Sequence, residues 1–146
     1  MQFAFFETAL RAQKSYSRLM EPVCKKWNLT HNELDVLLFL ANNPGLDTAR
    51  DVCTYRGLKP GIVSFHVEKL VQEGYLLRQP APGDRRKCRL VCTEKAGPVV
   101  QQGRELQETF FRRLARGLEP EDLAAFRRCL EGFRRNLSQM TQEDAQ

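Results

Sequence analysis

The feature that most restricts the fold is a change of hydrophobic period in the middle of the chain. Before Gly74, apolar residues recur at the three- and four-residue steps of helices, and after it they alternate every second residue, as in strands. Residues 76–78 and 86–93 are therefore predicted to pair as two strands around a turn at residues 80–84. On the second strand the alternation predicts one packed face and one charged face, formed by Cys88, Leu90 and Cys92 and by Lys87, Arg89 and Val91 respectively.

Two capping signals precede this hairpin and predict where helices begin. Thr30 and Glu33 have the T-x-x-E spacing of a capping box, in which each side chain binds the backbone N–H of the other residue. Thr48 and Asp51 form a second, weaker box. The first helix is expected to end at Pro44-Gly45, because proline and glycine both interrupt helices.

A third helix is predicted to begin at Lys59-Pro60, because proline at the first helical position loses no hydrogen bond that the helix needs. Gly57 is placed to stop the helix before it and Gly74 to stop this one. Its buried face is predicted to comprise Val63, Val67, Leu70 and Val71. Two short helices joined by a short glycine-containing turn form a helix-turn-helix, and the attached hairpin makes this segment a winged helix.

Long amphipathic helices are predicted at both ends of the chain. In the N-terminal segment, Pro22 is expected to kink or restart a helix whose stripe comprises Phe6, Leu10, Ser17, Met20, Cys24 and Trp27. In the C-terminal segments the stripes comprise Val99, Leu106, Phe110 and Leu114, then Leu123, Phe126, Leu130, Phe133, Leu137 and Met140. Stripes this regular either pack within one subunit or form the seam of a homodimer, and we expect the homodimer.

The positive charge of the chain is confined to its middle third. Over 146 residues the formal net charge is +5, and the whole excess of basic over acidic side chains lies between residues 50 and 95. A local excess of this kind is either a solvated surface or the electrostatic footprint of a polyanion-binding site. The turn of the hairpin lies within this region.

The run GYLLRQPAPGDRRKCRLVCTEKAG (residues 74–97) resembles the wing of the multiple-antibiotic-resistance regulator (MarR) family of bacterial transcription factors. The resembling features are the Gly-x-x-x-Arg start, the proline-rich turn, the Asp-x-Arg tip and the Thr-x-Lys close. The resemblance implies a mainly α (α+β) fold, with a winged helix-turn-helix between dimerisation helices. It divides the chain into an N-terminal dimerisation helix (1–28), a DNA-binding region (29–95) and C-terminal dimerisation helices (96–146).

The resemblance also implies a set of DNA-binding residues on the third helix and the wing. Arg86, two residues after Asp84, is expected to enter a minor groove, where a narrow groove has a strong negative potential. Asp84 either orients an arginine or only forms the turn. The full set is Lys59, Pro60, Gly61, Ile62, Ser64, Phe65, Lys69, Arg78, Asp84, Arg85, Arg86, Lys87 and Arg89.

Within this set several roles follow from residue type. Ser64 is expected to hydrogen-bond a base or a phosphate, and Ile62 or Phe65 to touch a thymine methyl group. Lys69, Lys87 and Arg89 are expected to contact phosphates, and Arg78 either does the same or braces the winged helix against the first helix. Lys59 and Phe65 depart from the family pattern, which has a Ser or Thr cap and a polar reader at these places. His66 is expected to pack in the core.

Other functions find less support in the sequence. No G-x-S-x-G, P-loop, G-x-G-x-x-G or H-E-x-x-H motif is present, so we expect no enzyme, and neither a cofactor nor a metal site is predicted. The odd number of scattered cysteines and the absence of a membrane-spanning run favour a reduced, cytoplasmic protein. The expected partners are double-stranded DNA, a second copy of the chain and a small-molecule effector. The aromatic residues near the N-terminus either line a pocket for this effector or pack in the core; they are Phe3, Phe5, Phe6 and Tyr16.

Two alternatives to a ligand-responsive repressor that binds a pseudo-palindromic operator stay open at this point. One is redox sensing through Cys24, whose neighbours Lys25 and Lys26 are expected to lower the pKa of its thiol. The other is a winged helix whose basic residues bind an acidic protein instead of DNA.

Overall fold

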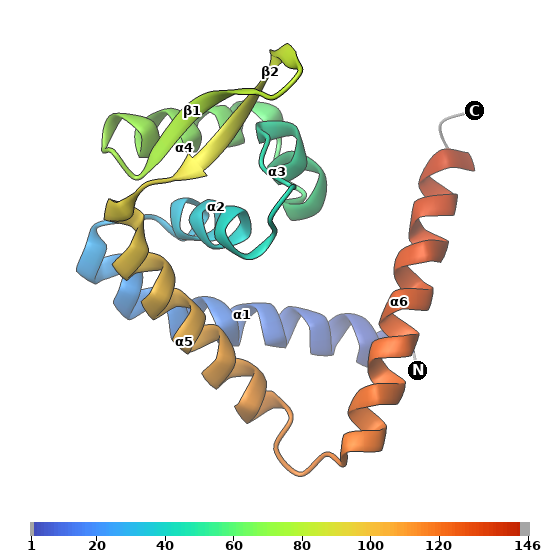
Figure 1. The fold of residues 1–146 in the computed structure, drawn as a ribbon. Coiled ribbons are helices and arrows are strands. Elements are labelled where there is room, and N and C mark those ends of the chain that lie inside the picture. The colour runs from blue at the N-terminus through green and yellow to red at the C-terminus, as the bar shows by residue number, and fades with distance from the viewer. Residues whose placement is uncertain (1, 144–146) are drawn as a thin grey trace. The chain divides into compact units, whose positions relative to one another are not determined.

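The computed structural model describes the backbone of residues 2–143, with all their side chains except those of residues 2, 3, 85, 86 and 141–143. The chain divides into two compact units, residues 1–110 and 111–146. Along the described chain the elements are α1 (Gln2–Trp27), α2 (His31–Asn42), α3 (Ala49–Arg56), α4 (Pro60–Gln72), β1 (Leu76–Ala81), β2 (Asp84–Cys92), the 3₁₀ helix η1 (Glu94–Ala96), α5 (Gly97–Leu114) and α6 (Pro120–Glu143) (Figure 1).

The predicted start and stop signals of the three central helices are confirmed. Thr30 and Thr48 each cap a helix with both hydrogen bonds of the capping box in place. Pro60 occupies the first turn of α4, and Gly57 ends α3 in the left-handed conformation with φ of +64°. Residues other than glycine rarely adopt such an angle, which explains why glycine marks this end.

Pro22 neither ends nor restarts the N-terminal helix. α1 runs without a break from Gln2 to Trp27, with Pro22 inside it. The second half of its stripe is buried, including Met20 and Cys24, whereas Phe6 and Leu10 in the first half are exposed. Only part of the stripe is therefore used in the core of its own subunit.

The core of the first unit is centred on α2. This helix packs against α1, α3, α4 and β2, and its residues Val36, Leu37 and Leu38 are fully or almost fully buried. The stripe predicted for α4 is confirmed for Val63, Val67 and Leu70, which are buried, while Val71 is half-buried. Burial of this apolar area is the main source of stability that fixes α4 against α2.

The wing is an antiparallel hairpin that is longer than the sequence predicted. β1 pairs with β2 in a register that places Leu76 opposite Cys92 and Pro80 opposite Cys88. The register shifts between Pro80 and Ala81, since Ala81 lies opposite Asp84, and residues 85–87 of β2 occupy this irregularity. The turn itself is only Pro82 and Gly83, and Gly83 adopts a φ of +78°.

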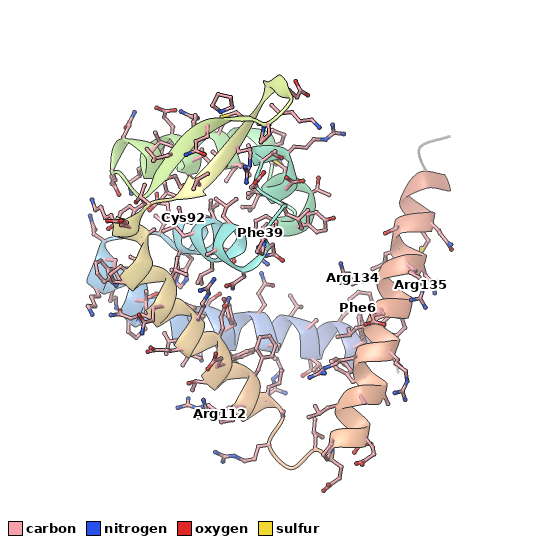
Figure 2. The ribbon with its side chains drawn as sticks, viewed as in Figure 1. Phe6, Phe39, Cys92, Arg112, Arg134 and Arg135 are labelled. Carbon is pink, nitrogen blue, oxygen red and sulfur yellow. The ribbon has the colours of Figure 1, made fainter. Side chains whose placement is uncertain are left out.

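Only part of the predicted packed face of β2 is buried. Leu90 is buried and Cys92 half-buried, and the Cys92 thiol lies 3.8 Å from the carbonyl oxygen of Leu37, where β2 approaches α2 (Figure 2). Cys88 is exposed, contrary to the prediction, because the hairpin extends beyond the helices at its base (Figure 1). Strand alternation sets the face of a side chain but not how far the core reaches beneath it.

Helix α5 contacts α1 and α2 through side-chain hydrogen bonds and one close approach between backbone and side chain. Trp27 donates to Gln102, and Gln107 donates to the hydroxyl of Tyr16. Between these contacts, Gly103 is buried, and a Cβ atom there would lie 2.7 Å from Cδ2 of Leu38. Leu38 is only 2% exposed and has little room to move.

Substitution of Gly103 by alanine is therefore expected to lower the free energy of unfolding by about 1–3 kcal/mol through overpacking. Chemical denaturation of the variant measures the change. The matched control is Gly132→Ala in α6, where the nearest atom to the added Cβ is 3.9 Å away in a flexible arginine side chain. That variant is expected to be as stable as the parent or up to about 1 kcal/mol more stable, because alanine favours helices. Equal effects in both variants would contradict the close approach.

Candidate nucleic-acid interface

Most of the residues of α4 that were predicted to contact DNA lie on the exposed side of this helix. Pro60, Gly61, Ile62, Ser64 and Phe65 are all exposed in the first two turns. Lys59 precedes the helix in an extended conformation and makes no side-chain cap, so its ammonium group is not used to start the helix. This end of α4 therefore presents a cation and a mainly apolar surface to solvent.

Lys69 lies on a different part of α4, and its ammonium group points to an acid inside the fold. Glu33 of α2 is fully buried, and its carboxylate lies 3.0 Å from Nζ of Lys69 and 3.2 Å from Nδ1 of His66. The other ring nitrogen of His66 lies 3.3 Å from the side-chain amide of Asn32. The prediction that His66 packs in the core is confirmed, and the same carboxylate also accepts from the backbone N–H of Thr30.

These contacts decide the charge state of Glu33. Burial alone raises the pKa of the Glu33 carboxyl, but the N–H of Thr30 and the donors on Lys69 and His66 outweigh burial, and the pKa lies below its ordinary value. The hydrogen bond to Glu33 in turn raises the pKa of Lys69. Both shifts indicate a charged pair that joins α2 to α4 from within the winged helix.

Two arginines of the wing are also engaged by acids. Nε of Arg89 donates to Asp47 over 2.6 Å, and the backbone N–H of Leu90 donates to the carbonyl of the same residue over 2.7 Å. Arg78 at the base of the hairpin lies 2.8 Å from Glu68 of α4. The wing is thus anchored to the segment before α3 and to α4. Arg78 is a brace, as one of its two expected roles required, but its partner lies on α4 and not on the first helix.

Towards the tip the wing presents its charge outward. Lys87 is exposed and Asp84 is half-buried at the start of β2. The side chains of Arg85 and Arg86 lie outside the described residues. Among the residues that are described, neither Lys59 nor Lys87 takes part in an ion pair, in contrast to Lys69, Arg78 and Arg89.

Sequence reasoning missed the acids that hold these cations. Glu33 was fully explained by its capping box, and nothing in its neighbourhood indicated a partner 36 positions away. Asp47 is 42 positions from Arg89 and lies in a loop without a motif. The exposed Arg50 near the start of α3 was also not selected, although the first helix of a helix-turn-helix crosses the DNA backbone.

The predicted low pKa of Cys24 is wrong. Burial, followed by the charge of Glu21, raises the pKa of this thiol. The two neighbouring lysines do not counter this effect, because Lys25 lies 3.2 Å from Glu21 and the ammonium group of Lys26 lies over the ring of Trp27. A buried thiol beside a carboxylate is less ionised, and hence less reactive, than the sequence implied.

A cavity of about 140 Å³ lies between α1, α2 and α3 of the first unit. Tyr16, Met20, Asn32 and Arg56 are among its lining residues. Of the aromatic residues considered for an effector pocket, Tyr16 lines it, whereas Phe5 and Phe6 are more than half exposed and do not; the side chain of Phe3 is outside the described residues. Asn32 joins this cavity to α4 through its bond to His66.

Neither a membrane-spanning helix nor a metal-binding cluster is found among the described residues. None of the helices in residues 2–143 is long and apolar enough to cross a membrane. Nor do three or more His, Cys, Asp or Glu side chains there converge in a way that suits a metal ion.

Comparisons with known proteins agree with this architecture. The model of the MarR family matches residues 27–87, which contain α2, α3, α4 and most of the wing. A comparison with curated protein sequences gave no match. The residues that match the family model are therefore those of the winged helix.

Solved structures of low sequence identity share the fold over nearly the whole chain. A MarR transcriptional regulator from Methanosarcina mazei is 18% identical with a TM-score of 0.77, covering 96% of this chain and 99% of its own. CouR from Rhodococcus jostii, solved with p-coumaroyl-CoA bound, is 18% identical with a TM-score of 0.74 and 90% coverage of both chains. Apo MarR from E. coli is 17% identical with a TM-score of 0.64, covering 87% of this chain and 94% of its own. The central segment of this chain therefore matches the MarR family model, and the chain shares the winged-helix fold of these solved structures over nearly its whole length.

Proposed function

We propose that this protein is a DNA-binding transcriptional regulator that acts as a homodimer and places α4 in the major groove and the wing in a minor groove. The observation that carries the proposal is the division of its cations. Lys69, Arg78 and Arg89 are paired with acids that hold the winged helix together, whereas Lys59 and Lys87 are exposed at the start of α4 and towards the tip of the wing. The start of α4 and the wing tip are where a winged helix meets the duplex.

Each residue group has a distinct role in this proposal. Lys59, Lys87 and Arg50 contact phosphates, which position the protein without reading sequence. Arg86 enters the minor groove, assisted by Arg85, and Asp84 orients the tip. Arg89 and Arg78 keep the wing in place, because their guanidinium groups bind Asp47 and Glu68.

A repressor that responds to a ligand is the finer form of the proposal. The cavity lined by Tyr16 and Arg56 shares Asn32 with the network that holds His66 on α4. In this form of the proposal α4 has two arrangements, and a ligand that contacts Asn32 binds one of them more tightly than the other. The ligand then increases the population of that arrangement, and the affinity of the protein for DNA changes as a result. At about 140 Å³ the cavity fits only a small ligand unless α1 or α2 moves.

Binding to duplex DNA is expected to weaken steeply with salt, because each neutralised phosphate releases counterions. Fluorescence anisotropy against a duplex selected by the protein from a random pool, at several salt concentrations, gives the affinity and its salt slope. Lys87→Ala is expected to weaken binding to all duplexes alike and to lower the slope by about one per bound copy. Arg86→Ala is expected to weaken specific binding by about 1–3 kcal/mol.

Glu105→Ala is the control, because this exposed residue lies on α5, away from the winged helix. Its affinity and salt slope are expected to match the parent. No affinity for any duplex, together with binding to an acidic protein, would overturn the proposal in favour of a protein-interaction module. Normal affinity of Arg86→Ala would remove only this residue from the interface.

A further inference from the structure

The exposed face of the first two turns of α4 is apolar to a degree that is unusual for a surface that reads DNA. Phe65 is 66% exposed and Ile62 is 43% exposed. Residues three apart on a helix are surface neighbours, so these two side chains form one continuous patch. The opposite face of the same turns is in the core, with Val63 and Val67 buried, so the patch is not a displaced part of that core.

Side chains that read purines by paired hydrogen bonds are missing from this patch. Guanine is usually read by Arg or Lys and adenine by Asn or Gln, each with two hydrogen bonds to the base edge. Residues 60–65, all within the described chain, contain none of these four types. The next long polar side chains on α4 are engaged, since Glu68 binds Arg78 and Lys69 binds Glu33.

One group in the major groove matches an apolar patch, and that group is the 5-methyl of thymine. We infer that Ile62 and Phe65 form an apolar reading pair that selects sites by the 5-methyl groups of thymine. The inference rests on the proposed function, because it assumes that α4 enters the major groove. It assigns the specificity of α4 to contact with methyl groups instead of hydrogen bonds to purines.

The surroundings of the pair suit a DNA partner more than an apolar protein surface. Lys59 is exposed immediately before the helix, and the exposed Ser64 precedes Phe65 in the same turn. A Cβ atom added at Gly61 would have no atom within 4 Å, so the backbone at this turn is open to close approach. The ring of Phe65 contacts the ring of His66 edge to face, with centroids 5.3 Å apart, and His66 is itself held by Glu33 and Asn32. The aromatic reader is therefore ordered before DNA arrives, which lowers the entropy lost on binding.

Replacing thymine by deoxyuridine tests the inference directly, because this change removes the methyl group and keeps every hydrogen bond of the base pair. The probe is a duplex selected by the full-length protein from a random pool, made once with thymine and once with deoxyuridine in its major-groove contact region. Anisotropy titrations with the parent protein are expected to show about fourfold weaker binding for each contacted methyl group that is lost.

Two variants assign that discrimination to the pair. Phe65→Ala and Ile62→Ala are each expected to prefer the thymine duplex less strongly than the parent protein, because each removes one member of the pair. Leu77→Ala is the control, because Leu77 is 52% exposed but lies at the base of the wing, and its preference for thymine is expected to match the parent. Thermal unfolding of all three variants checks that they fold, and the test with the parent protein does not depend on any variant.

The outcomes separate this inference from the proposed function. Sequence-specific binding with equal affinity for the thymine and deoxyuridine duplexes overturns the inference and leaves the function in place. A preference for thymine that is undiminished in both Phe65→Ala and Ile62→Ala also overturns it, because the methyl groups are then read elsewhere. Failure to bind any duplex, with capture of an apolar protein surface by the same patch, overturns both.

Discussion

Replacing Glu33 with alanine is expected to lower the free energy of unfolding by about 2–4 kcal/mol, because a buried carboxylate that accepts several hydrogen bonds is lost. Its carboxylate is fully buried and accepts from the N–H of Thr30, Lys69 and His66. The variant loses the hydrogen bond that Glu33 contributes to the capping box of α2, and it leaves the buried ring of His66 without its acceptor, whereas the partly exposed Lys69 can bind water. Urea denaturation, monitored by circular dichroism, measures the change.

The matched control for this prediction is Glu68→Ala. Glu68 also binds a cation, Arg78, but both side chains are about half exposed, at 51% and 42%. Ion pairs in such positions contribute at most about 1 kcal/mol. If the two variants lose similar stability, the buried network does not hold α4 as described. DNA affinity is expected to fall in Glu33→Ala under conditions where the variant remains folded.

The same network predicts a dependence of stability on pH. The pKa of Glu33 is lowered in the folded protein from its ordinary value of 4.5, so folding favours the ionised form. The resulting stabilisation is fully present above the unfolded pKa and is lost as the pH falls through the folded pKa. The stability difference between the parent and Glu33→Gln is therefore expected to be greatest at neutral pH and to shrink below about pH 4.5. A difference that stays constant down to low pH would contradict the lowered pKa.

Replacing Phe126 with glutamate is expected to convert the proposed homodimer to monomers at micromolar concentration. The apolar stripe predicted for the last helix is present on α6, where Phe126 is 59% and Leu130 is 39% exposed within a single chain. An exposed apolar stripe on a long helix suits a helix–helix interface between subunits. An unpaired carboxylate buried at that seam would destabilise the dimer by several kcal/mol.

Arg128→Glu is a demanding control for the dimer prediction. Residues two positions apart in a helix point about 200° away from each other around its axis, so Arg128 lies on the face away from Phe126. Arg128→Glu introduces the same glutamate side chain and changes the net charge more than Phe126→Glu does, yet this variant is expected to stay dimeric. Sedimentation velocity distinguishes the two species. A parent protein that is monomeric at micromolar concentration, or a dimeric Phe126→Glu, would show that the stripe on α6 is not the seam.

Loss of the dimer is also expected to weaken binding to a site with two half-sites by about 10²–10⁴-fold, because the second contact is no longer intramolecular. Affinity for an isolated half-site is expected to be nearly unchanged, since Phe126 is not part of the winged helix. Anisotropy with the full and the half duplex separates these effects.

Much of the fold was predictable because its signals are local. A capping box spans four residues, the end of α3 needs one glycine with positive φ, and a strand is recognised from alternation within one segment. For this reason the three central helices, the hairpin and the exposed start of α4 were correct from the sequence. The restart allowed for the helix at Pro22 was wrong, since packing of α1 on both sides of the proline outweighs the hydrogen bond lost there.

What the sequence determined about this protein is the order of its elements and the set of cations in its middle third. Only the tertiary structure decided which of those cations are engaged inside the fold. Glu33 meets Lys69 across 36 positions and Asp47 meets Arg89 across 42, and the same packing buries Cys24 against the expected effect of its lysine neighbours. The physical reason is that helical and strand periods relate residues only a few positions apart, whereas desolvation and ion pairing depend on distances in space that packing alone sets.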